Sequence, residues 1–190
     1  MTALLSGDQA RRVSSALTTL GVLGFWVQLV FLIAVVILGG YVLRVVGGSA
    51  GTGNVLSLLG LALPVFTTIW CRRYAAFGRA LAGSVEAPSP AQLRRALWIG
   101  VWAGVAGTVV AILSLFGAAS ALLVTMLANP QVGIQVSPTD TGVSPYTISA
   151  IDAVSIMALL LMLTAELLVV TISLRLVFIF DRAVRSGATT

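Results

Sequence analysis

Residues 153–180 constrain this chain more than any other feature, because they form an apolar run whose only ionisable members are Glu166 and Arg175. A helix crosses the hydrocarbon of a bilayer with about 20 residues at about 1.5 Å each, so the run is long enough to span a membrane. Glu166 lies near its centre. A carboxylate at that depth costs roughly 2.5–3.5 kcal/mol on insertion scales, which predicts that it faces other helices and not lipid.

The composition of the whole chain supports the same class. Hydrophobic residues make up 58% of the 190 residues and charged residues only 9%, and the mean hydropathy is +1.07. A soluble domain carries about 25% charged residues, so this supply cannot cover a surface that faces water. The alternating segments of a transmembrane barrel are absent from the sequence. We therefore predict an all-α fold in one integral membrane domain.

Four apolar segments predict a four-helix bundle. The expected spans are residues 22–43, 54–71, 97–120 (with the helix continuing to about 128) and 153–180, and a short interfacial helix is expected over residues 9–20. Ser89, Pro90 and Gln92 combine an N-cap, a first-turn proline and a capping-box glutamine, so a helix should begin there. Ser144 and Pro145 indicate a second such start, after a polar loop over 129–145.

The arginines predict the orientation. All eleven basic residues are arginine, and four spans place ten of them on the side that holds both chain ends. Arg44 alone falls on the other side. Because loops rich in Lys and Arg remain on the cytoplasmic side, both termini should be cytoplasmic, or stromal in an organelle.

The residues and motifs that several classes of function require are missing from this sequence. The chain has no histidine and a single cysteine, Cys71, and it contains no nucleotide loop, catalytic triad or metal-hydrolase motif. The basic residues form no cluster on a solvated domain, which argues against nucleic acid as a partner. Cys71, Met126, Met157 and Met162 differ in expected depth, so we interpret them as packing residues. We therefore expect that the protein is not an enzyme and binds no cofactor. The sequence does not identify metal ligands.

Glu166 is the main candidate for function. Asp152 precedes it by two heptads and projects from nearly the same helix face, so the two acids could mark a polar path. Gln28 and Thr108 lie at depths where they could join that path. A structural alternative is a neutral Glu166 that hydrogen-bonds across the bundle to Thr108.

Gln28 and Arg175 lie at comparable depth if the expected span limits hold. They could pair with each other. Alternatively, Arg175 could extend its side chain to the membrane interface, as long basic side chains commonly do.

A stripe of small residues marks the third span. Gly100, Gly104, Gly107, Ala111 and Ser114 recur at steps of four and three, which places them on one helix face. Small residues let another helix approach closely, so this face should pack against a neighbouring helix or receive a partner.

Three stretches resemble a known family. They are residues 12–30 with Phe25-Trp26-Val27-Gln28-Leu29, residues 72–79 with Arg73-Tyr74 and Gly78-Arg79, and residues 149–152. They resemble the cyanobacterial and plastid family of uncharacterised four-span proteins that includes the twenty-one-kilodalton Tic subunit of the chloroplast inner envelope, also called permease in chloroplasts. The resemblance implies a plasma, thylakoid or envelope membrane. It also implies one of two roles, namely iron permeation or help in moving and assembling proteins.

Two functional hypotheses follow. The first is a small permease-like protein, for iron or another divalent cation, with a path along Glu166, Asp152 and Gln28. The second is a non-transporting subunit or assembly factor of a photosynthetic or protein-import complex, which docks a membrane-protein partner through the glycine-rich face. Self-association through that face is compatible with either hypothesis. The lipid bilayer is the partner common to all of them.

Overall fold

A computed structural model describes residues 7–45, 53–83, 88–128 and 150–187. They form four helices: α1 (Gly7–Val45), α2 (Gly53–Gly83), α3 (Pro90–Ala128) and α4 (Ala150–Gly187). The described part of the chain is thus all-α, as the composition predicts. The expected turn at 47–52, the loop at 129–145 and the helix start at Ser144 and Pro145 lie outside the described residues.

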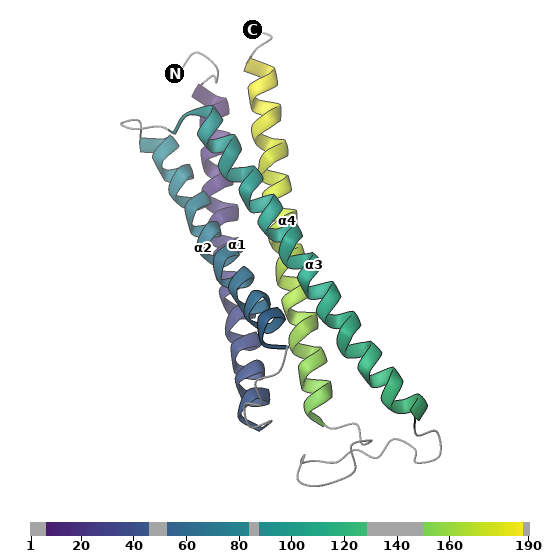
Figure 1. Cartoon of the computed structure of the whole chain (residues 1–190). Coiled ribbons are helices and arrows are strands. Elements are labelled where there is room, and N and C mark those ends of the chain that lie inside the picture. The colour runs from purple at the N-terminus through teal and green to yellow at the C-terminus, as the bar shows by residue number, and fades with distance from the viewer. Residues whose placement is uncertain (1–6, 46–52, 84–87, 129–149, 188–190) are drawn as a thin grey trace.

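The helices run alternately up and down in one bundle (Figure 1). α1 packs against α2 and α4, and α3 packs against α4 and, to a smaller extent, α2. The start of α1 and the end of α4 therefore lie at the same end of the bundle, together with the end of α2 and the start of α3. We call this end the terminal end and the opposite one the distal end.

The observed helices are longer than the expected spans. Residues 9–20, where we expect a separate interfacial helix, are the first turns of α1, which continues without a break to Val45. Val13 and Leu17 on these turns are 2% and 1% exposed, so they belong to the packed interior of the bundle. α2 continues past Cys71 to Gly83, whereas α3 ends at Ala128, where we expect this helix to end.

The capping box at the start of α3 is confirmed. The Gln92 backbone N–H donates to Ser89 Oγ over 3.1 Å, and the Ser89 backbone N–H donates to Gln92 Oε1 over 3.0 Å. Two amides that the helix itself leaves without partners are satisfied in this way. Ser89 thus caps the N-terminus of α3, which begins at Pro90.

The bundle has apolar residues outside and polar residues inside. Trp102, Phe116 and Phe178 are 67%, 69% and 71% exposed, whereas Gln28, Thr67 and Glu166 are at most 1% exposed. Soluble proteins rarely leave contiguous apolar surface of this kind uncovered. α1, α3 and α4 are each long and apolar enough to cross a membrane. The protein is therefore a helical membrane protein, with lipid as the natural neighbour of its outer side chains.

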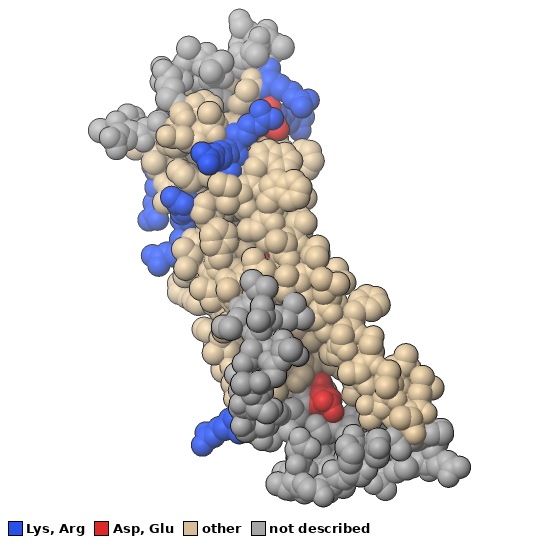
Figure 2. All heavy atoms as spheres, in the orientation of Figure 1, with Lys and Arg blue, Asp and Glu red and all other residues tan. Residues whose placement is uncertain are grey.

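Basic side chains gather toward the terminal end, as Figure 2 shows for one face of the molecule. The sequence places Arg11 and Arg12 in the first turns of α1, and Arg182 and Arg185 in the last turns of α4. Arg44 stands in the last turn of α1, at the distal end. A broad uncharged band separates the two ends in Figure 2.

The main apolar core lies in the terminal half of the bundle. Its buried members come from all four helices, and they are Val13, Leu17, Tyr74, Leu93, Leu97, Val101, Leu176, Val177 and Phe180. The buried residues of α3 run only from Leu93 to Ala111. Toward the distal end this helix diverges from α4, as Figure 1 shows.

Candidate functional site: a buried carboxyl among α2, α3 and α4

Glu166 lies in the middle of α4 with its side chain fully inside the bundle. The residue is 0% exposed, so no water-sized space adjoins the carboxyl. Ala165 and Val169, beside it on α4, are buried as well. The side chain faces α2 and α3 and not the outer surface, as expected for an acid in an apolar span.

Gly107 of α3 makes room for this carboxyl. A Cβ atom at position 107 would lie 2.5 Å from Glu166 Cδ and 2.7 Å from Oε2. Even one methyl group there would overlap the acid, so the carboxyl rests directly on the α3 backbone. The predicted glycine stripe thus forms one wall of the site.

Thr67 of α2 is the hydrogen-bonding neighbour of the acid. Its Oγ1 lies 3.4 Å from Glu166 Oε1 and 3.2 Å from the Pro64 carbonyl oxygen, and it accepts a hydrogen bond from Gln28 Nε2 over 3.1 Å. Hydroxyl hydrogen bonds usually span 2.5–3.0 Å, so the contact between Thr67 and Glu166 is long. One hydroxyl proton also cannot serve both Pro64 and Glu166 fully.

The second carboxyl oxygen has no partner at all among the described residues. Glu166 Oε2 is buried, and no hydrogen bond reaches it. Buried polar atoms are nearly always hydrogen-bonded, because an unsatisfied one costs about 1–3 kcal/mol. Glu166 Oε2 is therefore a buried acceptor for which the described residues provide no hydrogen-bond donor.

A column of buried polar groups continues from this site toward the terminal end. Cys71 and Tyr74 follow Thr67 on the same face of α2, and Ser173 follows Glu166 by two turns on α4. The hydroxyls of Tyr74 and Ser173 lie 3.0 Å apart. Tyr74 packs its hydroxyl against Gly100 of α3. All three side chains are 0% exposed, so this column contains no open channel.

Met162 lies next to the acid on the distal side. It is 4% exposed, and its Cε lies 3.5 Å from the position of a Cβ on Gly60 of α2. Asp152, in the first turn of α4, is half-buried. Two heptads of α4 separate the acids by about 21 Å along the helix axis, at about 1.5 Å per residue. The structure therefore does not bring Asp152 to Glu166, and Met162 lies between them.

The other expected site residues have different partners. Thr108 Oγ1 donates to the Gly104 carbonyl of its own helix over 2.9 Å, so the expected bond between Thr108 and Glu166 is replaced by the contact with Thr67. Gln28 donates to Thr67, while Arg175 is exposed, so these two side chains do not pair. The sequence pattern does not single out Thr67 as a site residue.

The glycine face of α3 is packed within the chain. A Cβ on Gly104 would lie 2.7 Å from Val170 Cγ2, and Gly100 lies against Tyr74 and Trp70. Gly107 and Ala111 are buried, and Ser114 is half-buried. The chain's own α2 and α4 therefore occupy most of the face that we expect to receive a neighbour.

The described residues do not form a cluster of side chains that commonly bind metal ions. Among them, no group of three His, Cys, Asp or Glu side chains is able to hold a metal ion. Cys71 and Met162 are buried, whereas Met126 and Met157 are 46% and 54% exposed. A cation at Glu166 would have two oxygen-bearing side chains as neighbours, the carboxyl itself and the Thr67 hydroxyl.

These features define a class, namely helical membrane proteins in which an acid lies buried among the helices, here Glu166. Within it, the chain belongs to the family described as "Protein of unknown function (DUF3611)", whose model matches residues 8–180. No curated protein and no solved structure gave a significant match. The family match thus covers α2, α3 and most of α1 and α4, and it assigns no activity to them.

Proposed function

We propose that this protein is a small, non-enzymatic, permease-like membrane protein that carries a cation past Glu166. The observation that carries the proposal is Glu166 Oε2, a buried acceptor without a hydrogen-bond partner among the described residues. Ionisable groups inside membrane spans mark ion or proton pathways by default. A bound cation, or a proton, would supply what this oxygen lacks.

The proposed topology has four spans, α2 being the fourth, and both termini in the cytoplasm. The distribution of arginine supports it, because ten of the eleven stand toward the terminal end in sequence and only Arg44 toward the distal end. The positive-inside rule then assigns the terminal end to the cytoplasm. The resemblance of residues 12–30 and 72–79 to the plastid and cyanobacterial family supports a plasma, thylakoid or envelope membrane, and iron or another divalent cation as cargo.

In the proposed mechanism the described conformation is occluded. Tyr74 and Ser173 close the site toward the terminal end, and Met162 closes it toward the distal end. The cation exchanges with the Glu166 proton while Thr67 stays as the second oxygen ligand. Access from either side requires that α2 and α4 separate locally, on the distal side between Gly60 and Met162, on the other side between Tyr74 and Ser173.

The experiment is cation flux into liposomes that contain the purified full chain. Ferrous iron, manganese and protons are tested separately, with Glu166→Gln as the critical variant. Asp181→Asn is the matched control, because it removes an acid from the same helix outside the bundle interior. We expect Glu166→Gln to reduce flux at least tenfold and Asp181→Asn to leave it within twofold. No flux for any cation, or equal flux in Glu166→Gln, would remove the proposal.

A second candidate is a non-transporting subunit or an assembly and translocation factor. The observation that favours it is the distal half of α3, where Phe116, Val124 and Leu127 are 69%, 65% and 70% exposed and the helix has left α4. A partner helix could pack there without displacing α4, which already covers Gly104 and Gly107. Loss of a co-purifying partner in Phe116→Ala, with Glu166→Gln unaffected, would favour this candidate over the permease.

A further inference from the structure

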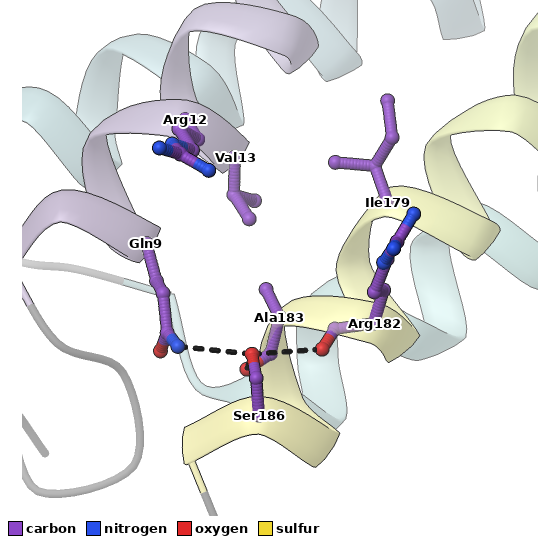
Figure 3. Close-up of a pocket in the computed structure, with 7 residues that line it drawn as sticks. All are labelled: Gln9, Arg12, Val13, Ile179, Arg182, Ala183 and Ser186. Carbon is purple, nitrogen blue, oxygen red and sulfur yellow. Dashed lines mark hydrogen bonds between the residues drawn. The ribbon is translucent and has the colours of Figure 1, made fainter.

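A pocket opens at the terminal end between the first turns of α1 and the last turns of α4 (Figure 3). Its volume is about 400 Å³. It is separate from the Glu166 site, which lies in the middle of α4 and is fully enclosed. This volume is large enough for a phosphate group together with part of the molecule that carries the phosphate.

Two arginines flank this pocket from different helices. Arg12 stands on α1 and Arg182 on α4, and Figure 3 shows them on opposite sides of the space. Both are exposed, and no acidic residue is among the described residues that line the pocket. In the neighbouring turns, the sequence adds Arg11 and Arg185 against Asp8 and Asp181. Four arginines against two aspartates leave an excess of two positive charges around the pocket.

Apart from the two arginines, two polar and three apolar residues line the pocket. Gln9 Nε2 donates to Ser186 Oγ over 2.9 Å and links the two helices at the pocket's edge, and Ser186 Oγ donates in turn to the Arg182 carbonyl. Val13, Ile179 and Ala183 provide the apolar lining. Val13 belongs to the buried core, and Ile179 packs against that core, so the apolar side of the pocket continues into the bundle.

The position of the pocket fits the surface of a bilayer. Arg182 comes two residues after the apolar run that ends at Phe180. Arg175 lies two turns earlier on the same face of α4 and is also exposed. Cationic side chains thus follow this helix face from the hydrocarbon boundary outward, with Ile179 between them.

We propose that this pocket binds the phosphate headgroup of an anionic phospholipid, held between Arg12 and Arg182 and seated on Val13, Ile179 and Ala183. Arginine pairs with phosphate through two parallel hydrogen bonds, which gives both affinity and orientation. Basic pockets between membrane helices on the cytoplasmic side are suited to anionic headgroups. A free phosphate would use the two arginines but would leave the apolar lining without a contact, which favours the lipid.

The test is lipid retention by the purified full chain in mild detergent, measured by native mass spectrometry. Phosphatidylglycerol is titrated against phosphatidylcholine, and the critical variant is the double substitution Arg12→Gln and Arg182→Gln. The matched control is Arg94→Gln with Arg95→Gln, which removes the same charge at the same end of the bundle. We expect about a 30-fold loss of phosphatidylglycerol affinity in the critical variant, or about 2 kcal/mol at 1.4 kcal/mol per tenfold change, and less than threefold in the control.

A second variant keeps every charge. Ala183→Phe fills the pocket, and we expect it to lose phosphatidylglycerol as the double arginine variant does, so the test stands even if the latter fails to fold. Undiminished binding in Ala183→Phe, or equal losses in the critical and control variants, would mean diffuse attraction and overturn the proposal. If millimolar inorganic phosphate displaces the bound lipid as readily as glycerophospholipids do, the pocket is a site for free phosphate. That result would also overturn the proposal.

Discussion

The two halves of α3 carry the same kind of residues and behave differently. In the terminal half, Gly100, Gly104 and Gly107 each lie against a side chain of α2 or α4. In the distal half, Ser114 continues the stripe but is only half-buried, and Gly117, beside the stripe, has nothing within 4 Å of a Cβ. A small-residue stripe therefore permits close packing without producing it. The neighbouring helix must also remain within reach, and toward the distal end α3 diverges from α4.

Glycines on the other helices show the same contrast. Gly78 of α2 meets the backbone of α1 at Ser14 and Thr18, and Ser14 Oγ donates to the Gly78 carbonyl over 2.7 Å. Gly39 and Gly40, near the distal end of α1, have nothing within 4 Å of a built Cβ. The terminal half is thus held by direct backbone approach, whereas Gly39 and Gly40 in the distal half meet no neighbouring helix, and Gly60 there makes only ordinary contact with the flexible Met162 side chain.

The largest effect should come from Gly78→Ala. The nearest atoms to its new Cβ include backbone atoms of α1, at 2.7 Å for Thr18 N and 2.8 Å for Ser14 O, and these cannot rotate away. Overpacking of this kind costs about 3 kcal/mol. Gly117→Ala is the control, and it should stabilise the helix by up to about 1 kcal/mol, because alanine is the better helix former. Unfolding in mild detergent measures both, and equal stability of the two variants would contradict the contrast between halves.

A smaller loss is expected for Gly107→Ala. The new methyl group meets the carboxyl of Glu166, the end of a flexible side chain that can move at a cost of about 1–2 kcal/mol. Combining Gly107→Ala with Glu166→Ala should recover about 1 kcal/mol relative to the sum of the single changes, since residues in contact are coupled. A double-mutant cycle of unfolding free energies measures this recovery. Strict additivity would mean that the carboxyl does not rest on Gly107.

The smallest effect is expected for Thr67→Val. The change keeps the side-chain shape but removes the acceptor for Gln28 and the only hydrogen-bonding neighbour of Glu166 among the described residues. We expect a loss of about 1 kcal/mol, the usual net value of a buried hydrogen bond. Thr164→Val is matched to it, because Thr164 is exposed and bonds only to the Leu160 carbonyl of its own helix. The Thr164→Val variant should be as stable as the unchanged protein. If it loses as much stability as Thr67→Val does, the loss is a general effect of removing threonine hydroxyls.

The four apolar helices and the start of α3 could be predicted from the sequence, because apolar length and capping chemistry are local properties. The capping box of Ser89 and Gln92 needs only residues three apart, and both of its hydrogen bonds are present. The separate interfacial helix was expected from the polar start at Arg11 and Arg12. The structure shows that Val13 and Leu17, on the opposite side of the same turns, give this segment a core-facing stripe and continue it into α1.

The partner of Glu166 could not be predicted in the same way. Periodicity says which residues share a face of their own helix, and length says roughly how deep they lie. Neither says how far each helix is rotated about its axis relative to its neighbour. Thr108 and Thr67 both satisfy the depth requirement, and only the packing of α2 against α4 decides that Thr67 faces the acid.

The close contact between Gly107 and Glu166 has a consequence for the history of the family. The carboxyl fills the volume in which a side chain at position 107 would stand, so neither position can change freely on its own. Sequences that carry alanine or serine in place of this glycine should carry a shorter residue in place of the acid. An alignment of relatives would reveal that pairing as covariation between α3 and α4, two helices separated in sequence by residues 129–149.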